Sequence, residues 1–566
     1  MVWRASDPQG NEASKIMWEI VPFTNGRTLD LGCGPYKPFK HFIGVDNMHH
    51  AQAFNWEFKP DVHVDTCENL DLFASESCHA VFSSHLLEHI KDYKAALKEW
   101  WRMVKPGGYL ILYLPHKDYY PNIGEENANK DHKHDFVPQD IVDAMQATPG
   151  WDLLENQTRS GLNEYSFFQV YRKRTDDKIF IAKKTDKKTA AVIRYGAFGD
   201  IIMASSILPG LKEQGYHITV YTVKNAWEVI KNDPHVDRFI VQGADQVPNH
   251  QLGPFWHYLS SKYDKFINLS ESVEGTWLAL PGRSAHSWPA DVRRKYLKQN
   301  YIEFAHDLAG VPMPCRSKFY ATDEEKKWAR ITKRRMAARA VVWSLAGSSV
   351  HKAWPHVDRA ISRILYAYKN VKVVLVGDGL CKILEAGWGE EPRVFCRSGE
   401  WNIRQSMAFC DVADLIIGTE TGLLNASGML ETPKICMLSH SSKENLTKHW
   451  KNTISMVPDY TPCYPCHRMH YGWEFCHKDS DSSSALCQHN ITLPMVWKAI
   501  VEKLGPVRVE CPPEEEGQIV LHDGKALIQQ EVLEAIQTMY GPYTTPNKIT
   551  DYGPCRETME IAKEKP

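Results

Sequence analysis

The chain has 566 residues and a mass of 64.8 kDa, which at about 100–200 residues per domain predicts three or four domains. Its composition is 43% hydrophobic and 24% charged, and this excludes a mainly disordered or fibrous chain. The 67 Lys and Arg residues nearly balance the 69 Asp and Glu residues, which leaves a net charge of −2. The chain as a whole therefore has no general attraction to nucleic acid or to an anionic membrane.

No segment reaches the roughly 18 consecutive apolar residues of a membrane span. The N-terminus also lacks the apolar core of a secretory signal. We therefore expect a cytoplasmic protein with no transmembrane segment. In that reducing compartment, clustered cysteines favour a metal site over a disulfide framework.

Three short apolar runs that end in glycine resemble the first strand of a nucleotide-binding α/β domain. They cover residues 28–34, 190–200 and 340–349. Between them, apolar strands alternate with amphipathic helices, which is typical of parallel sheets covered on both faces. Strands are expected at 109–114, 217–223, 265–269, 371–376, 415–417 and 434–438, and helices at 91–103, 201–214, 358–368 and 403–410.

Charged stretches mark the boundaries between these domains. Residues 173–188 are interpreted as a solvated linker rather than a nucleic-acid patch, and a second break is expected near 322–339. A C-terminal extension, 506–566, is expected to be partly disordered because its end is rich in Pro, Gly, Thr and charge. The expected domains are 1–172, 189–325 and 339–505.

The first domain carries features of an adenosine-binding site. Gly32 and Gly34 let the backbone turn sharply and approach a ligand. Asp46 ends the next predicted strand, where a carboxylate can accept hydrogen bonds from both hydroxyls of a ribose. NAD is the first competitor, but its fingerprint requires a glycine at the position of Lys37. S-adenosylmethionine has no phosphate and needs no such cradle, so we favour it.

Four segments resemble class I S-adenosylmethionine-dependent methyltransferases, and they occur in that family's order over roughly residues 25–172. They are Leu-Asp-Leu-Gly-Cys-Gly at 29–34, Ile-Gly-Val-Asp at 43–46, and the segments 80–90 and 104–112. The resemblance implies a Rossmann-like methyltransferase domain that binds S-adenosylmethionine.

The same resemblance implies seven cofactor-site residues. They are Asp30, Gly32 and Gly34 around the methionine part, Asp46 at the ribose, Asp65 or its neighbours near the adenine, and Ser84 and His85 at the border of the methyl-transfer pocket. Pro35 and Pro38 lie in the short stretch between the first two strands. The helix that the family usually has there is therefore expected to be very short or absent.

Several histidines and one acid near this pocket have open roles. His85, Glu88 and His89 are of the types used in metal binding or acid–base chemistry. The simpler interpretation, which we favour, is that Glu88 and His89 begin a helix and face only solvent or a neighbour. Three histidines further along the chain are candidates for the lining of an acceptor pocket: His116, His132 and His134.

In the second domain, Gly196 and Gly199 precede Asp200 at a probable helix start. The two glycines let a substrate approach the backbone closely. An aspartate at a helix start is usually a cap worth about 1 kcal/mol. The alternative is a general base at the mouth of the sheet, where α/β domains bind ligands.

The third domain offers groups suited to a diphosphate. Residues 345–355 follow a strand and supply small residues, the hydroxyls of Ser348 and Ser349, and the ammonium group of Lys352. This is not a Walker loop, because Gly-Lys-Ser/Thr is absent. Glu420, Thr421 and Gly422 lie between a strand and a helix, so the N–H groups of the latter two can meet a second phosphate.

These pieces resemble the ADP-heptose:lipopolysaccharide heptosyltransferases of glycosyltransferase family 9, which have the GT-B fold, over about 189–500. The motifs are Gly196–Asp200, Lys352-x-Trp-Pro and Glu420-Thr-Gly. The sequence departs from the family at Glu420, where the family has Asp, and at Asn425, where a His often follows. The donor sugar and its nucleotide therefore stay open.

The resemblance implies a nucleotide-sugar site and a catalytic base. In it, Asp200 deprotonates the acceptor hydroxyl, Lys352 neutralises the leaving diphosphate, Ser348, Ser349, Thr421 and Gly422 bind phosphate, Glu420 contacts the donor sugar, and Gly196 and Gly199 line the approach. The implied partners are a nucleoside-diphosphate sugar and a glycan or glycoconjugate acceptor. Peripheral membrane contact stays open for a lipid-linked acceptor.

Four cysteines near the C-terminus have a spacing that suggests a zinc site. They are Cys463, Cys466, Cys476 and Cys487, with histidines interleaved. A tetrahedral zinc site takes four such ligands, and Cys-x2-Cys is its usual first half. The second half has no Cys-x2-Cys, so two disulfides or unligated thiols remain the alternative to structural zinc.

The sequence thus predicts an α/β chain in which a Rossmann-like methyltransferase domain precedes a GT-B glycosyltransferase of two Rossmann-like domains. The expected function is bifunctional: methyl transfer from S-adenosylmethionine and inverting transfer of a heptose-like sugar. One alternative is a glycosyltransferase with a non-catalytic first domain. Another is a nucleic-acid methyltransferase, which the neutral charge and the absence of an Asn/Asp-Pro-Pro-Tyr/Phe motif disfavour. We therefore expect no nucleic-acid partner.

Overall fold

The computed structural model describes residues 11–49, 58–148, 150–161, 163–175, 186–243, 245–313, 318–347, 349–470 and 476–507. Two compact units are present: Met1–Asp186 with Ile240–Tyr263, and Lys187–Phe239 with Asp264–Pro566. Most of the predicted linker and nearly all of the predicted C-terminal extension lie outside the described residues. Among the described helices, none is long and apolar enough to cross a membrane.

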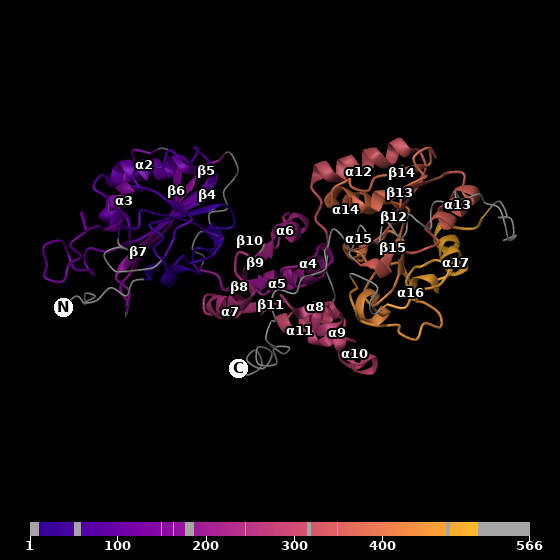
Figure 1. Ribbon diagram of the computed structural model, residues 1–566. Coiled ribbons are helices and arrows are strands. Elements are labelled where there is room, and N and C mark those ends of the chain that lie inside the picture. The colour runs from indigo at the N-terminus through magenta and orange to yellow at the C-terminus, as the bar shows by residue number, and fades with distance from the viewer. Residues whose placement is uncertain are drawn as a thin grey trace. The chain divides into compact units, whose positions relative to one another are not determined.

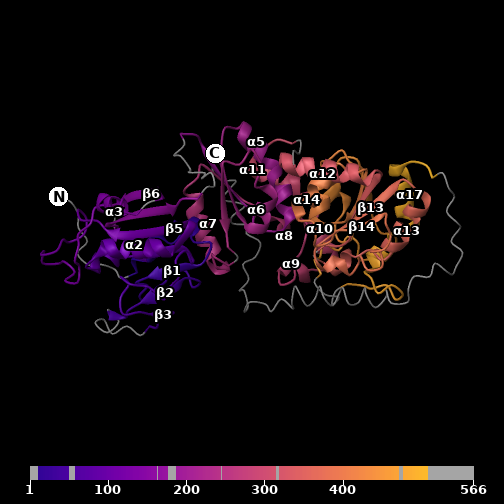
Figure 2. The same ribbon diagram turned by 90° about the horizontal axis from the view of Figure 1, so that it is seen from above.

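The first unit is built on a seven-stranded sheet in the order β3-β2-β1-β4-β5-β7-β6. Its strands are β1 (Thr28–Leu31), β2 (Ile43–Asp46), β3 (Val62–His63), β4 (Cys78–Ser84), β5 (Val104–Pro115), β6 (Trp151–Arg159) and β7 (Ser166–Lys173). The first five strands are parallel, whereas β7 runs antiparallel to β5 and to β6. Figure 2 shows β3, β2 and β1 side by side towards one edge.

Strand order reverses between β1 and β4, because the chain builds outward from β1 to β3 and then returns to the other side of β1. Open α/β sheets bind ligands beyond the carboxyl ends of the strands at such a reversal. The segments that follow β1, β2 and β4 therefore form the first candidate site.

The first unit also contains several helices. They are η1 (Glu12–Ile16), η2 (Val21–Phe23), η3 (Leu87–His89), α2 (Tyr93–Met103), α3 (Pro138–Met145), η5 (Asn249–Gln251) and α7 (Leu252–Ser260). The Asp92 side chain caps α2, and Leu97 and Trp100 of this helix are buried. The helix packs against β4 and β5 (Figure 1). All residues between β1 and β2 are described and none is helical, as the two prolines predict.

A four-stranded sheet in the order β10-β9-β8-β11 follows in the chain, and the division between the two units falls within its strand β10, after Phe239. Its strands are β8 (Thr189–Ile193), β9 (His217–Val223), β10 (Arg238–Gln242) and β11 (Lys265–Asn268). The single helix predicted at 201–214 is divided into α4 (Phe198–Ala204), η4 (Ser205–Ile207) and α5 (Leu208–Glu213). Pro209 explains the division, because it has no N–H to donate to the preceding turn.

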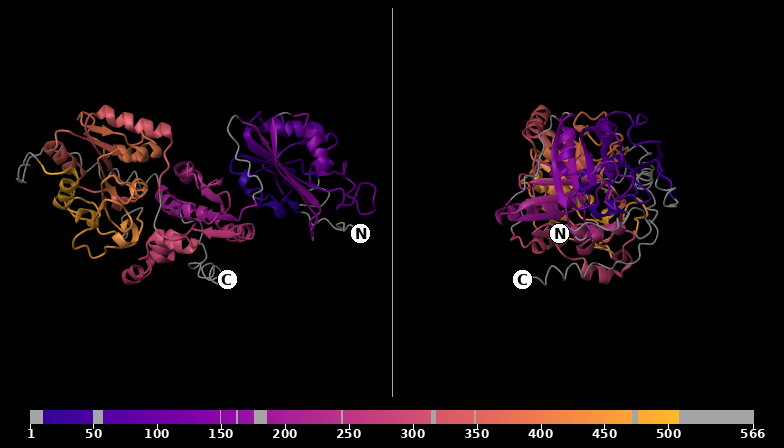
Figure 3. Two further views of the ribbon diagram at one scale, coloured as in Figure 1. Left: turned by 180° about the vertical axis from the view of Figure 1, so that it is seen from behind. Right: turned by 90° about the vertical axis from the view of Figure 1, so that its left-hand side faces the viewer.

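A six-stranded parallel sheet follows, in the order β14-β13-β12-β15-β16-β17. Its strands are β12 (Arg339–Ser344), β13 (Val371–Val376), β14 (Val394–Cys396), β15 (Leu415–Thr419), β16 (Lys434–Met437) and β17 (Thr453–Met456). Figure 3 shows these strands from behind, with helices alongside them. This confirms the predicted fold class: one Rossmann-like sheet is followed by the two parallel sheets that a GT-B fold requires.

Helices of the second unit connect and flank its two sheets. Besides α4 and α5 they are α6 (Lys224–Ile230), α8 (Ser272–Thr276), α9 (Ser284–Ser287), α10 (Ala290–Tyr296), α11 (Tyr301–Ala309), α12 (Asp323–Met336), η6 (Val350–Lys352), α13 (Val357–Ala367), η7 (Leu380–Lys382), α14 (Ile403–Cys410), α15 (Gly422–Ser427), η8 (Lys443–Thr447), α16 (Leu486–His489) and α17 (Leu493–Leu504).

The charged stretch near 322–339, expected as a break between domains, is largely the helix α12. Thr322 caps the N-terminus, and the Glu325 side chain returns to the Thr322 N–H, which is a capping box. Glu325 also receives two hydrogen bonds from the buried Arg404 of α14, at 2.6 and 2.8 Å. The charged residues of this stretch therefore cap the helix and bind it to α14, and they do not form a solvent-exposed loop.

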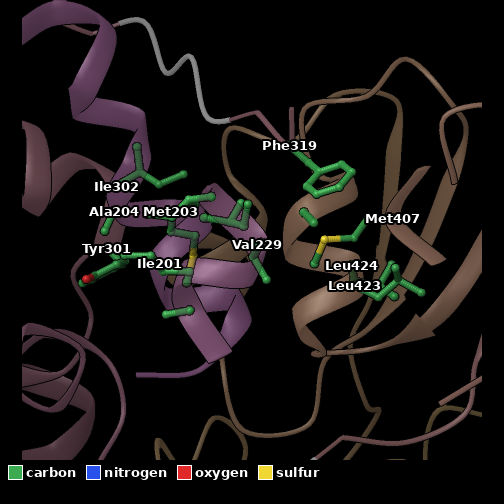
Figure 4. Packing of buried hydrophobic residues seen from close by; sticks show 14 of the residues in the cluster. Ile201, Met203, Ala204, Val229, Tyr301, Ile302, Phe319, Met407, Leu423 and Leu424 are labelled. Carbon is green, nitrogen blue, oxygen red and sulfur yellow. The ribbon is translucent and has the colours of Figure 1, made fainter. Parts of the chain in front are cut away.

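One apolar cluster is continuous across both sheets of the second unit. Figure 4 shows Ile201 and Met203 of α4 beside Val229 of α6, and Leu423 and Leu424 of α15 beside Met407 of α14, all members of this cluster. The helices α4 and α15 pack directly against each other. Both carry predicted site residues at their first turns, so this contact places those residues at one location.

Candidate functional sites

The loop after β1 requires glycine at two positions. Gly32 has φ +70° and Gly34 has φ +51°, which is the left-handed region. A Cβ at Gly32 would also lie 3.0 Å from the Leu86 side chain, whereas a Cβ at Gly34 would meet nothing within 4 Å. The sharp turn at the end of β1 therefore depends on the absence of side chains.

Three predicted acids lie in or just after neighbouring parallel strands of this sheet. Asp46 ends β2 and is half-buried; its carboxylate accepts from the Gly34 N–H at 3.0 Å and the Met48 N–H at 2.6 Å. Asp30 lies in β1. Burial and the nearby charge of Asp46 raise its pKa well above the usual range, while the charge of Lys37 acts in the opposite direction. Asp65 is exposed just after β3. Asp46 is thus the acid best placed to meet a ligand at the glycine turn.

Ser84 is the last residue of β4, the strand beside β1, and His85 follows it. His85 has φ +52°, an uncommon backbone conformation for a residue other than glycine. Its N–H donates to the Tyr113 carbonyl at 2.8 Å, and its Nε2 lies 2.9 Å from the Ser166 hydroxyl. The structure therefore brings these two residues to the same sheet edge as the glycine turn and Asp46.

Glu88 is a buried acid surrounded by histidines. It belongs to η3, so the predicted helix start is present, but its side chain is fully buried instead of facing solvent. Its Oε1 lies 3.7 Å from His85 Nδ1, 3.9 Å from His89 Nε2 and 3.9 Å from His132 Nε2. Within the described part of the chain, no hydrogen-bond donor reaches either carboxylate oxygen. Burial raises the pKa of Glu88 to about 8.

The other two histidines considered for an acceptor pocket have partners elsewhere. His116 Nδ1 accepts from the Asp118 N–H at 3.1 Å. His134 Nε2 lies 3.1 Å from the Lys91 carbonyl. Of the three candidates, His132 is therefore the one that joins the Glu88 group.

In the second unit, Asp200 lies in the first turn of α4 but does not cap it. The N-cap position is Ala197, and no side chain caps the helix. Asp200 Oδ2 instead accepts from Arg194 Nη2 at 2.6 Å, and Arg194 Nη1 donates to the Leu269 carbonyl at 2.9 Å. Arg194 is 2% exposed and Asp200 22% exposed, so a buried cation orients a carboxylate that solvent reaches.

Glycines bring the two helix starts of this site together. A Cβ at Gly199 would lie 2.2 Å from Asn425 Nδ2, and one at Gly422 would lie 2.9 Å from Phe198 Cβ. A Cβ at Gly196 would meet the Arg194 guanidinium at 3.0 Å. Side chains at these positions would separate α4 from α15 or disturb the ion pair.

Lys352 is buried beside the same helices. Its Nζ donates to the Glu420 carbonyl at 2.7 Å. Burial lowers its pKa, while the charges of Glu420 and Asp200 act in the opposite direction. The lysine thus lies within electrostatic reach of Asp200, as a site with a base and a phosphate-binding cation requires.

Glu420, Thr421 and Ser349 use their side chains to hold loops. The Glu420 carboxylate accepts a hydrogen bond from the Ser439 hydroxyl at 2.7 Å. Burial by itself would raise the pKa of Glu420, but the neighbouring donors and positive charges outweigh it and lower the pKa to about 2. The Thr421 hydroxyl caps α15. The Ser349 hydroxyl donates to the His470 carbonyl at 2.5 Å. Ser348 lies outside the described residues.

The four clustered cysteines lie near one another in the second unit. Burial first, and then the nearby Cys466 and Cys463, raise the pKa of Cys476 to about 12. Burial and the other three cysteines raise the pKa of Cys487 well above its usual value. Their sulfurs are not among the described ligand groups whose donor atoms all lie within 4.8 Å of one another. The four sulfurs are thus gathered in one region, but they are not arranged as closely as the ligands of a single metal ion.

The cysteine segment also joins the two halves of the second unit. The Ala279 N–H donates to the His467 carbonyl at 2.7 Å, and the Met469 N–H returns to the Ala279 carbonyl at 2.9 Å. Arg293 Nε donates to the Cys466 carbonyl at 2.9 Å. The cysteine segment therefore lies where it can hold the two halves of the second unit together.

Sequence reasoning missed Arg194 and the segment 240–263. Arg194 follows directly after β8, and an arginine between an apolar strand and a glycine turn was a usable signal. Residues 240–263 belong to the first unit, where Gln246 Nε2 donates to the Val21 carbonyl at 2.7 Å. No local pattern indicates that contact, because its partners are far apart in the chain.

Comparison with known proteins agrees with the first site. Residues 29–112 match the family model of a methyltransferase domain. No curated protein matches the chain. The match includes the glycine turn, Asp46 and the end of β4.

Similar solved structures include both expected kinds of protein. A glycosyl transferase of family 9 from Veillonella parvula is 15% identical, with 48% of this chain and 87% of that chain covered at TM-score 0.37. The ADP-heptose LPS heptosyltransferase II of E. coli is 15% identical, with 56% and 98% covered at 0.39. An S-adenosylmethionine-dependent methyltransferase from Mesorhizobium loti is 15% identical, with 28% and 96% covered at 0.23. All three TM-scores are below 0.5, so we base the proposed function on the chain's own residues.

The two glycines of the β1 turn are expected to differ in tolerance. Gly34→Ala incurs only the left-handed backbone cost, about 1–2 kcal/mol. Gly32→Ala adds the contact with Leu86, for about 1–3 kcal/mol more. Hydrogen exchange of β1 and β4 peptides in the full chain measures both. Equal destabilisation by the two variants would show that the contact with Leu86 is unimportant.

Proposed function

We propose that the chain is a bifunctional transferase, with an S-adenosylmethionine-dependent methyltransferase in the first unit and an inverting glycosyltransferase in the second. The observation that carries the first half is the convergence of the Gly32–Gly34 turn, Asp46 and His85 beside the strand reversal, within the segment matched as a methyltransferase domain. The second half is carried by the Arg194–Asp200 pair beside the buried Lys352.

The first site has groups that fit S-adenosylmethionine. The glycine turn leaves open space at Gly34 for a ligand to approach the backbone, and Asp46 can accept hydrogen bonds from ribose hydroxyls. Asp65 is exposed and is assigned to the adenine end, and the buried Asp30 precedes the turn at the methionine end. When bound, the cofactor supplies an activated methyl group. Ser84 and His85 then border the acceptor.

The second site has groups that fit glycosyl transfer. Asp200, oriented by Arg194, accepts the proton of the acceptor hydroxyl. The acceptor oxygen attacks the anomeric carbon from the side opposite the nucleoside diphosphate, which inverts that centre. Lys352 neutralises the departing diphosphate. A general base must be ionised to accept a proton, and the buried Arg194 guanidinium holds the Asp200 carboxylate in one orientation.

The remaining predicted residues have narrower roles in this proposal. Because the side chains of Ser349, Glu420 and Thr421 are engaged in internal hydrogen bonds, they shape the loops around the diphosphate. The backbone N–H groups of Thr421 and Gly422 are the phosphate donors. Gly196 and Gly199 keep the approach to the base free of side chains. The donor is a nucleoside-diphosphate sugar, heptose-like by resemblance.

We further propose that one glycan or glycoconjugate is both extended and methylated. The motivation is that both transferases share one chain. Mass spectrometry of the product made with both donors would show a glycan that gains the sugar and the methyl group. Methylation of an unrelated molecule only would reject this coupling.

We also propose that Cys463, Cys466, Cys476 and Cys487 bind a structural zinc ion. Burial first, and then the neighbouring cysteines, raise the pKa values of Cys476 and Cys487, which indicates that these sulfurs are gathered in one place. Zinc would accept four thiolates and close the segment between the two halves of the second unit. It has no catalytic part in the proposal.

Binding of S-adenosylhomocysteine tests the first activity. Calorimetry of the full chain should show one site, and Asp46→Asn should weaken binding about 10–100-fold, because a hydrogen bond to a charged group contributes about 1.5–3 kcal/mol. Asp71→Asn, an exposed acid of the same unit, is the matched control. A wild-type chain that binds nucleotide but no S-adenosylhomocysteine would favour a non-catalytic first unit, consistent with its missing helix after β1.

Asp200→Asn tests the base. Calorimetry with ADP, UDP, GDP and CMP first identifies the nucleotide, and the matching sugar donors are then assayed for transfer. The variant should lose about 10²–10⁴-fold in kcat while nucleotide affinity is kept, since only proton acceptance is removed. Asp411→Asn, an exposed acid at the end of α14, should leave kcat unchanged. Undiminished transfer by Asp200→Asn would reject the assignment.

Metal analysis tests the cysteine cluster. Protein purified without chelator should contain one zinc more than its Cys476→Ser or Cys487→Ser variant. Cys396→Ser, a half-buried cysteine elsewhere in the unit, should keep the wild-type content. Equal zinc in all four proteins would contradict zinc binding and leave disulfides or free thiols.

A further inference from the structure

Two groups of acid and histidine side chains converge tightly among the described residues. One is Glu88, His89 and His132 in the first unit, and the other is His351, Glu420 and His440 in the second; in each, the donor atoms lie within 4.8 Å of one another. The two groups differ in how their carboxylates are satisfied, and that difference decides which of them needs an additional partner.

Glu420 already has its partners. It accepts from the Ser439 hydroxyl at 2.7 Å and from the Ser441 N–H at 3.0 Å, and it is in contact with His440. Glu88 has no hydrogen-bond donor on either oxygen among the described residues, although its side chain is fully buried. An unpaired buried carboxylate is costly, so a native structure normally supplies a partner for it.

The backbone holds the histidines of the first group in place. The N–H groups of Lys133 and His134 both donate to the Glu88 carbonyl, at 2.7 and 3.2 Å. This pair of bonds ties the segment that carries His132 to the short helix that carries Glu88 and His89. The His132 ring also stacks on Tyr120, with centroids 5.2 Å apart. The arrangement is therefore built from two distant parts of the chain and is braced on both sides.

We propose that Glu88, His89 and His132 bind a divalent first-row transition-metal ion. Two imidazoles and one carboxylate form a donor set that such ions take, with coordination positions left for other ligands. Each imidazole Nε2 lies 3.9 Å from Glu88 Oε1, a separation that an ion between them bridges with ordinary bond lengths near 2.0–2.2 Å. The ion supplies the positive charge that the buried carboxylate lacks.

His85 extends the group toward the methyl-transfer pocket. Its Nδ1 lies 3.7 Å from the same Glu88 oxygen, while its Nε2 contacts the Ser166 hydroxyl, the kind of second hydrogen bond that orients a metal-binding imidazole. This step rests on the proposed methyltransferase function: the open coordination positions of the metal ion take an oxygen atom of the methyl acceptor. A metal-bound hydroxyl loses its proton more easily, so the acceptor class is a hydroxyl compound.

Manganese is the probe that separates this site from the cysteine cluster, because Mn²⁺ prefers nitrogen and oxygen donors to thiolates. Calorimetry and electron paramagnetic resonance of the full, chelator-treated chain should show one bound Mn²⁺. Glu88→Gln and His132→Gln should each weaken binding by more than ~100-fold, exceeding the loss typical of outer partners. His134→Gln removes an imidazole two residues away that contacts Lys91 instead, and should bind as the wild type does.

Absence of Mn²⁺, Co²⁺ and Zn²⁺ binding outside the cysteine cluster would overturn the metal site, as would equal Mn²⁺ affinity in all variants. Circular dichroism and S-adenosylhomocysteine binding confirm that each variant is folded. A chain that binds S-adenosylhomocysteine but no Mn²⁺ rejects this inference and keeps the methyltransferase. A chain that binds Mn²⁺ but no S-adenosylhomocysteine supports the metal site and rejects the methyltransferase and the acceptor role.

Discussion

Close contact between the first turns of α4 and α15 is the constraint on which the second unit depends. Gly199 and Gly422 have neighbours where a Cβ would lie, at 2.2 and 2.9 Å. This contact places Asp200 of one half within electrostatic reach of Lys352 of the other. The continuous apolar cluster beneath them stabilises the arrangement, so an acid and a buried cation that follow strands of different sheets lie at one location.

Buried charge is handled in contrasting ways in this chain. Arg194 is buried but donates to Asp200 and to two backbone carbonyls. Glu420 is buried and accepts from neighbouring serines. Glu88 is equally buried and has histidines near it, but its carboxylate accepts no hydrogen bond from the residues that the structure describes. A fully satisfied charge orients a site, whereas an unsatisfied one indicates that a ligand completes it.

The first site is formed where neighbouring strands of the first sheet end. The glycine turn follows β1, Asp46 ends β2 and His85 follows β4, and these three strands are neighbours in a parallel arrangement. The left-handed backbone of His85 shows that the chain accepts local strain there. An acid, a glycine turn with open space at Gly34 and a strained histidine thus meet where the strand order of the sheet reverses, as ligand sites in open α/β sheets do.

The sequence by itself determined the elements and the chemistry of the turns. Apolar runs and glycines predicted the three sheets, and the prolines after Gly34 predicted the missing helix, because these signals act through nearby backbone. Only the tertiary structure decided that Asp200 pairs with Arg194 instead of capping α4, that Glu88 is buried against His132, and that residues 240–263 fold with the first unit. These outcomes depend on contacts between residues far apart in the chain, and their energies arise from burial and charge pairing that no local pattern encodes.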